Sequence, residues 1–201
     1  MRWTWITLAF ACTIAPAPAA PNPAAADPAA ADPPDPPATE PRDAPPRAQG
    51  PDSKLSADAK AFVDVHNKLR AKHCARPLTW APRLAKIAQD WANALRDKGC
   101  AFEHSHGSTG ENLAAGTSGT LDPTAVVQMW YDEVAQYKFP DGGFSMKTGH
   151  FTQVVWRGTQ SVGCGRSQCK GLDIYVCEYD PPGNWEGEYR KNVLPKNCQG
   201  D

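Results

Sequence analysis

Apolar residues recur every three or four positions in three segments, which is the spacing of one face of an α-helix. The first segment follows Ser56, a residue type that caps helices well. The second begins at Pro82, where proline is tolerated, and ends at Gly99. The third follows Asp122 and extends to Tyr137. We therefore expect three amphipathic helices.

Two titratable residues lie on these apolar stripes. His66 lies on the first, where we expect a hydrogen-bonded core histidine. Glu133 lies on the third, three residues after Trp130. Burying an unpaired carboxylate is costly, so Glu133 needs a basic group, backbone donors or a metal ion as its partner. That partner decides whether Glu133 belongs to a structural ion pair or to a functional site.

Residues 149–156 read Gly-His-Phe-Thr-Gln-Val-Val-Trp, and their aromatic and β-branched side chains are typical of a buried strand. His150 would stand at the start of that strand, either as a solvated strand end or at the rim of a cleft. The glycine-rich loop 100–116 carries two histidines and two glutamates that could meet it. Together with Glu133, this loop favours the rim of a cleft.

Residues 162–177 predict a β-hairpin. If Lys170 and Gly171 form a two-residue turn, the register places Cys164 directly opposite Cys177. Cross-strand neighbours on one face are close enough for a disulfide. The register alone therefore predicts this disulfide.

The N-terminal part has no such periodicity. Residues 1–19 combine a basic start, a short apolar run and small residues, as a secretory signal does. The Leu-Ala-Phe-Ala-Cys sequence that ends at Cys12 resembles a lipobox, in which case Cys12 would be acylated; the alternative is ordinary cleavage a few residues later, which removes it. Residues 20–52, rich in proline and alanine, predict a disordered tether. The folded domain is then 53–201.

Composition narrows the function classes. The formal net charge is -1, and residues 1–52 hold only three of 21 basic and six of 22 acidic residues, so the domain is nearly neutral. We therefore expect no nucleic-acid partner. Seven cysteines imply metal binding or an oxidising compartment, and the signal favours the latter, outside the cell or in a bacterial cell envelope. Membrane contact is expected only through an acylated Cys12.

Several motifs, taken in order, resemble those of the CAP superfamily, the cysteine-rich secretory, antigen 5 and pathogenesis-related-1 proteins, whose domain is also called SCP. Residues 149–159 match its first signature, residues 174–185 are similar to its second, and Gly-Glu-Asn-Leu-Ala at 110–114 stands in the family's order. The resemblance covers roughly residues 56–198. It implies an α+β fold, an α-β-α sandwich with a small antiparallel sheet between helical layers.

The resemblance also implies a cleft lined by two histidines and two glutamates. On this chain they are His104, Glu111, Glu133 and His150. His106 competes for the first position, and the spacing from Cys100 favours His104. The four side chains are a credible ligand set for Zn²⁺ or another divalent cation. The alternative is a metal-free network in which the glutamates orient the histidines.

Three disulfides follow from the family's cysteine pattern: Cys100–Cys169, Cys164–Cys177 and, from the two cysteines left over, Cys74–Cys198. Glu178 departs from the family, which usually has asparagine or another uncharged or basic polar residue there. This departure is expected to change the charge near the cleft or the strand end.

Two functions are compatible with these features. Neither His-Glu-x-x-His nor Gly-x-Ser-x-Gly occurs in the chain, which favours binding over catalysis. The first function is a secreted or lipid-anchored binding module whose cleft takes a divalent metal, a lipid such as a sterol, or an extracellular protein. The alternative is a metal-dependent hydrolase, with His104 and His150 as ligands and Glu111 or Glu133 as general base.

Overall fold

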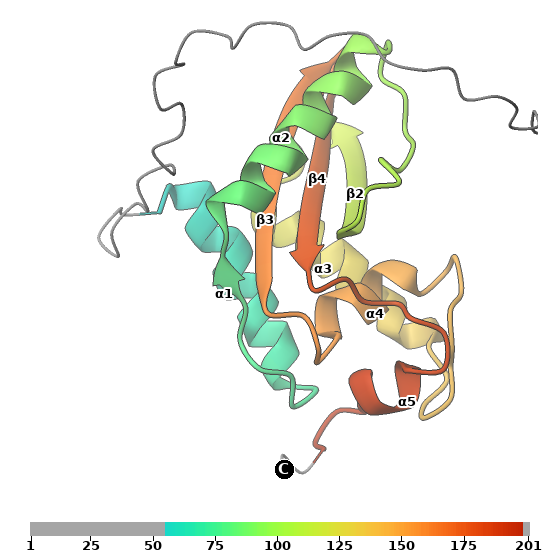
Figure 1. The fold of residues 1–201 in the computed structure, drawn as a ribbon. Helices are drawn as coiled ribbons and strands as arrows, with labels where there is room; N and C mark the ends of the chain where they lie inside the picture. The colour runs from blue at the N-terminus through green and yellow to red at the C-terminus, as the bar shows by residue number, and fades with distance from the viewer. Residues whose placement is uncertain (1–54, 199–201) are drawn as a thin grey trace, which may run out of the picture. The chain divides into compact units, whose positions relative to one another are not determined.

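A four-stranded sheet forms the centre of the computed structural model, which describes residues 55–198 (Figure 1). Its strands are β1 (Thr79–Trp80), β2 (Gly110–Thr117), β3 (Ser161–Cys169) and β4 (Leu172–Asp180), in the order β1-β3-β4-β2. The three long strands are antiparallel, and the short β1 pairs in parallel with β3, so the sheet is mixed. The expected signal, tether and Cys12 lie outside the described residues.

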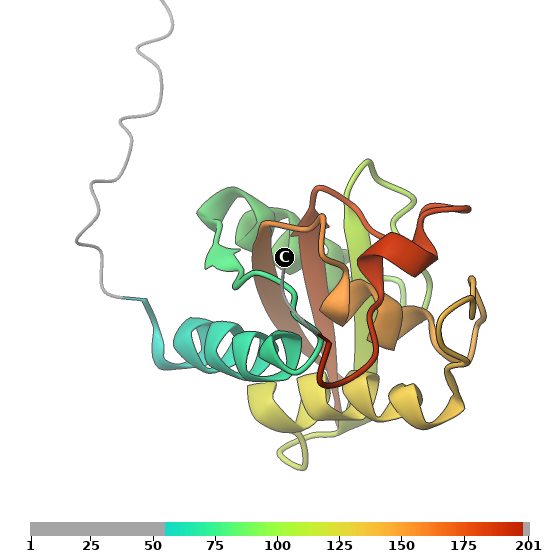
Figure 2. The same cartoon turned by 90° about the horizontal axis from the view of Figure 1, so that it is seen from below.

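Helices cover both faces of this sheet, which confirms the α-β-α sandwich. One face packs against α2 (Pro82–Asp97). The other face is covered by three helices: α1 (Ala57–Ala71), α3 (Pro123–Asp132) and α4 (Gly149–Val155). Figure 2 shows the sheet edge-on between these two layers. A 3₁₀ turn, η1 (Glu133–Gln136), follows α3 directly, and α5 (Tyr189–Asn192) lies near the C-terminus.

The α2 helix packs directly against the backbone of β3 at two glycines. A Cβ added at Gly163 would come within 2.1 Å of the backbone nitrogen of Ala85, and one at Gly165 within 2.4 Å of the Cα of Gln89. Any side chain here would force the helix away from the sheet. The α2 face of the sandwich therefore depends on these two positions.

The predicted hairpin is confirmed in its register. Cys164 pairs with Cys177 across β3 and β4, and their sulfur atoms form a disulfide. Lys170 and Gly171 both have positive φ, 49° and 80°, as a type I′ turn requires. The structure also contains the other two expected bridges, Cys74–Cys198 and Cys100–Cys169.

The strand expected at 149–156 is wrong, because this segment forms the helix α4. Its residues from Phe151 to Val155 are all buried, so the aromatic and β-branched side chains among them reflect burial on every side of a helix rather than the alternation of a strand. The first backbone amides of the helix donate to the carboxylate of Glu133, at 3.0 Å from His150 and 3.1 Å from Phe151. This cap favours a helix over an extended chain.

Arg70 joins α1 to the segment that follows α4. Its side chain is fully buried, and within the described residues its guanidinium donates four hydrogen bonds of 2.8–3.0 Å to backbone carbonyls. The acceptors are the carbonyl oxygens of Arg76, Val154, Trp156 and Thr159. Burial lowers the pKa of Arg70 to about 10, so the group remains charged at neutral pH.

Two buried histidines stabilise the same helical layer. His66 is a core histidine as expected: its Nδ1 donates to the carbonyl of Phe62 at 2.8 Å, and its Nε2 lies 2.9 Å from the hydroxyl of Tyr179. His73 contacts the Leu194 carbonyl and the Tyr131 hydroxyl in the same manner. Burial lowers the pKa of His66 to about 4 and also lowers that of His73.

Replacing Arg70 with lysine should destabilise the protein by roughly 2–4 kcal/mol, because an ammonium with three donors cannot bond four carbonyls in this planar arrangement. Lysine keeps the positive charge of arginine, so the lost stability measures the geometry of the hydrogen bonds rather than the charge. Chemical denaturation of wild type and Arg70→Lys measures it. The exposed Arg76→Lys is the control, with an expected change of about 0.5 kcal/mol or less. Equal effects of the two substitutions would refute the role given to Arg70.

The stability of the protein should decrease as the pH is lowered, in part because His66 is buried in its neutral form. A histidine in the unfolded chain titrates near its ordinary pKa, whereas folded His66 does so at about 4. The unfolded state therefore binds more protons between these values, and the contribution of neutral His66, present in full above pH 6.5, decreases as the pH falls to 4. Its size is roughly 3 kcal/mol.

Other groups titrate in the same pH range, so the contribution of His66 is measured as the difference between wild type and a variant that lacks this histidine. Between pH 7 and 4, the free energy of unfolding should decline less steeply for His66→Gln than for wild type. The difference between the two slopes should correspond to at most one proton bound by the unfolded state. Parallel curves for the two proteins would show that His66 does not carry this dependence.

Candidate functional site

Two histidine–glutamate pairs form the candidate site, and the first joins a loop to β2. The Nδ1 atom of His104, in the loop before β2, lies 2.6 Å from Oε1 of Glu111. The backbone amide of Ser105 donates to both oxygens of the same carboxylate, at 3.0 and 3.3 Å. The Glu111 side chain is 6% exposed and that of His104 49%. A largely buried carboxylate thus holds a half-exposed imidazole.

The second pair joins η1 to α4. Nδ1 of His150 lies 2.7 Å from Oε1 of Glu133, whose other oxygen accepts the first amides of α4. The ring of Trp130 stacks beside the imidazole, with centroids 6.2 Å apart and planes 20° apart. The predicted partner of Glu133 is therefore a set of backbone donors together with an imidazole.

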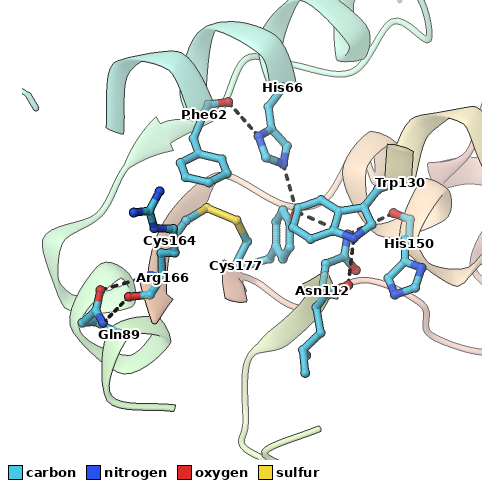
Figure 3. The surroundings of a disulfide bond; sticks show 11 residues. Phe62, His66, Gln89, Asn112, Trp130, His150, Cys164, Arg166 and Cys177 are labelled. Atoms are coloured by element: carbon cyan, nitrogen blue, oxygen red, sulfur yellow. Dashed lines mark hydrogen bonds between the residues drawn. A yellow bond between two sulfur atoms is a disulfide. The ribbon is translucent and has the colours of Figure 1, made fainter. Parts of the chain in front are cut away.

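Asn112 links this second pair to the sheet, next to the Cys164–Cys177 disulfide region (Figure 3). Its side-chain amide donates to the carbonyl of His150 at 3.2 Å and lies 3.3 Å from the hydroxyl of Tyr179. The indole of Trp130 donates to the Leu113 carbonyl on the same strand. Strand β2 therefore positions both pairs, Glu111 directly and His150 through Asn112.

Both imidazoles line one pocket of about 160 Å³, which we call the His/Glu pocket. Its lining residues are His104, Glu111, Asn112, Phe144, Met146, Gly149, His150 and Asn184. Glu133 is not among them and lies behind His150. Each Nδ1 is engaged by a carboxylate, so Nε2 is the nitrogen that each imidazole has left for a ligand. His106, the competing candidate, is exposed and does not line this pocket.

Glu178 is a third carboxyl group beside the site. It lies on β4 directly opposite Glu111 on β2 and is fully buried. The Thr109 hydroxyl donates to its Oε2, and its Oε1 has no hydrogen-bond partner within residues 55–198. Sequence reasoning noted Glu178 as a departure from the family but did not place it here; the pairing of β2 with β4 supplies that position.

The ionisation of Glu111, Glu178 and His104 is interdependent. Burial raises the pKa of Glu178 to about 7, and the nearby Glu111 adds to the increase. Burial would also raise the pKa of Glu111, but hydrogen bonds from His104 and Ser105 outweigh it and lower that pKa. The hydrogen bond from Glu111 in turn raises the pKa of His104. Glu111 therefore ionises at lower pH than Glu178, whose own ionisation falls near neutral pH.

Asn184 and two apolar residues were also missed by the sequence interpretation. Asn184 adopts a positive φ of 61°, accepts a hydrogen bond from the Thr152 hydroxyl and donates to the Gly149 carbonyl, so it fixes the chain after β4 to α4. Phe144 and Met146 lie in the loop before α4 and are exposed. Only the folded loop brings these side chains to the pocket.

The site offers a metal ion two imidazole nitrogens as ligands. Between residues 55 and 198, no group of three or more histidine, cysteine, aspartate or glutamate side chains is arranged to hold one. All six cysteines in this range are bridged. The available donors are the two Nε2 atoms, with the glutamates in the orienting position that carboxylates often take behind ligating histidines. With two such donors, a cation held here would need water molecules to complete its coordination.

Replacing Glu133 with glutamine should cost about 1–2 kcal/mol of stability, because an amide is a weaker helix cap than a carboxylate. The imidazole of His150 should also lose its single tautomer. Thermal denaturation measures the first effect, and the ¹⁵N shifts of the imidazole measure the second. Asp132→Asn is the matched control, since among residues 55–198 the Asp132 side chain bonds Gln128 on its own helix and no other residue. If His150 keeps one tautomer in Glu133→Gln, the orienting role is wrong.

Comparisons with known proteins extend over this same domain. Residues 63–179 match the model of the CAP family, described as the cysteine-rich secretory protein family. Protein PRY2 of Saccharomyces cerevisiae is 43% identical over 140 residues, which are 67% of this chain and 40% of that protein. Pathogenesis-related protein 1A of Nicotiana tabacum is 42% identical over 130 residues, or 63% of this chain and 77% of that protein.

A solved structure has the same fold. The one titled "Crystal structure of NaASP2 with Zn2+" superposes with a TM-score of 0.55 at 23% identity, covering 73% of this chain and 90% of that one. The chain spans less than half the length of the yeast relative. These yeast and plant relatives give no support to a bacterial-type lipoprotein. The family match covers more than half of the chain, and the protein therefore belongs to the CAP, or cysteine-rich secretory protein, family.

Proposed function

We propose that this protein is an extracellular binding module that holds a divalent cation between His104 and His150. One observation carries the proposal: both imidazoles line the same pocket, and a glutamate engages Nδ1 of each. A neutral imidazole that donates from Nδ1 has its lone pair on Nε2, which is the form that binds metal ions. Glu111 and Glu133 would hold His104 and His150 in the tautomer that is protonated on Nδ1.

The cation site would be weak and exchangeable. Zinc usually has four ligands, and structural sites take all four from the protein. Here His104 and His150 would hold the ion, and Glu111 and Glu133 would orient them rather than ligate. A bound cation would supply a positively charged position open to a further ligand. The solved structure with the same fold has Zn²⁺ in its title, which supports zinc as the first ion to test.

The hydrolase alternative has less support from the site. Catalytic zinc sites use three protein ligands and keep a carboxylate or another base available for the attacking water. The pocket offers two imidazoles, and both glutamates are already bonded to a histidine and to backbone amides. A general base would have to leave those contacts. These constraints favour binding over catalysis.

An apolar ligand is the second part of the proposal. Phe144 is 54% exposed and Met146 80% exposed, and both line the His/Glu pocket. Trp185, 60% exposed, lines a neighbouring hollow that shares Glu111 and Asn184 with this pocket. Large apolar side chains gathered at a polar cleft suit a lipid, a sterol or an apolar protein surface.

The disulfides support an extracellular location. Three bridges in so small a domain are typical of proteins that fold in an oxidising compartment. The family to which the chain belongs is described as secretory. A lipid anchor at Cys12 and a bacterial cell envelope stay predictions.

Zinc titration by calorimetry tests the proposal. Wild type should bind one Zn²⁺, and His104→Ala or His150→Ala should each weaken binding at least about tenfold, because one nitrogen ligand is lost. Glu133→Gln should also weaken it by about tenfold through the loss of orientation. His106→Ala, in the same loop as His104 but outside the pocket, should bind as wild type does.

Two results would overturn the cation site. The first is wild-type affinity in the double variant His104→Ala, His150→Ala, which would place any zinc elsewhere. The second is a loss in His106→Ala equal to that in His104→Ala. Hydrolysis of peptide or ester substrates that depends on His150 would instead favour the enzyme.

A further inference from the structure

A separate hollow, of about 620 Å³, lies at the loop after α1, the segment after α4 and the short helix α5. We call it the basic pocket, because Arg76, Arg157 and Lys191 line it and none of its lining residues is acidic. It shares no lining residue with the His/Glu pocket. A nearly neutral domain thus gathers three cations around one concavity.

The walls of the basic pocket are built on a fourth, buried cation. Three of the four carbonyls that accept from Arg70 belong to Arg76, Trp156 and Thr159, in or beside the segments that line the hollow. These contacts engage four of the guanidinium N–H groups of Arg70 but leave its charge without a carboxylate counterion among the described residues. A buried charge is screened less than an exposed one, so Arg70 adds a fixed positive potential to this region.

The backbone amides of the segment are not available to a ligand. The amide of Arg157 donates to the Asn192 carbonyl, that of Gly158 to the Asn192 side chain, and that of Gln160 to the Asp180 carbonyl. A ligand must therefore be bound by side chains. Arg76, Lys191 and Gln160 are exposed on the rim and carry nitrogen donors.

We propose that the basic pocket binds a phosphate group through Arg76 and Lys191, with the buried charge of Arg70 beneath it. A guanidinium presents paired donors that match two oxygens of a phosphate, and an ammonium adds a point charge. The hollow is several times larger than one phosphate, so the group is expected to be part of a larger molecule. This site is independent of the proposed cation site.

An ion pair to Glu188 competes with a phosphate for Lys191. Glu188, one turn before Lys191, forms an ion pair with it, and the two side chains are 44% and 74% exposed. An exposed pair of this kind is weak, so a phosphate could displace the glutamate. Removing the carboxylate should accordingly make Lys191 a better phosphate ligand rather than a worse one.

The experiment uses three probes that separate the sources of the phosphate: inorganic phosphate, glycerol 3-phosphate, and phosphatidylcholine vesicles containing phosphatidic acid. Backbone amide shifts follow the soluble probes at constant ionic strength, and cosedimentation follows the vesicles. Wild type should show saturable shifts at residues 157–160 with a soluble probe, or binding to the acidic vesicles. Arg76→Gln and Lys191→Gln should each weaken that binding about fivefold or more.

Two further variants test whether binding depends on Lys191 itself or on the net charge of the surface. Glu188→Gln should tighten binding, since it releases Lys191. Lys60→Gln removes the same charge from an exposed ion pair on α1, outside the pocket, and should bind as wild type does. The proposal is overturned if no probe binds wild type more tightly than the Arg76→Gln, Lys191→Gln double variant. It is also overturned if Lys60→Gln weakens binding as much as Lys191→Gln, because net surface charge would then explain the effect.

Discussion

The carboxylate of Glu133 stabilises a helix and orients a functional imidazole with the same two oxygens. One oxygen accepts the first amides of α4, where the positive end of the helix dipole favours an anion. The other accepts from Nδ1 of His150. A partly buried carboxylate on an apolar stripe is tolerable because each of its oxygens accepts a hydrogen bond. The fold of α4 and the tautomer of His150 therefore depend on one side chain.

Glu111 has the same relation to His104 in a different setting. Its backbone donor is a single loop amide, from Ser105, and its neighbour across the sheet is Glu178. The paired carboxyls cannot both ionise cheaply in a buried position, and hydrogen bonds from His104 and Ser105 favour the ionised form of Glu111. The two imidazoles of the pocket are thus equivalent in residue type but not in electrostatics.

Sequence patterns predicted the parts of this fold that depend on local rules. Helical spacing located α1, α2 and α3, and the Lys170-Gly171 turn set a register that placed Cys164 against Cys177. The same reasoning mistook α4 for a strand, because a helix buried on all sides has no polar face to reveal its period. The positions of Glu178 and Phe144 depend on strand pairing and on a loop, which a single sequence does not encode locally.

Residues 149–160 contribute to both the His/Glu pocket and the basic pocket. Their first turn carries His150 in the His/Glu pocket, and their last residues line the basic pocket. Glu133 fixes the start of this segment through its amides, and Arg70 fixes its end through its carbonyls. Each charged group satisfies the backbone atoms that a helix terminus leaves unpaired, an anion at the start and a cation beyond the end. The two charged groups therefore complete the hydrogen bonding of the α4 backbone, and by doing so they position the segment that contributes residues to both pockets.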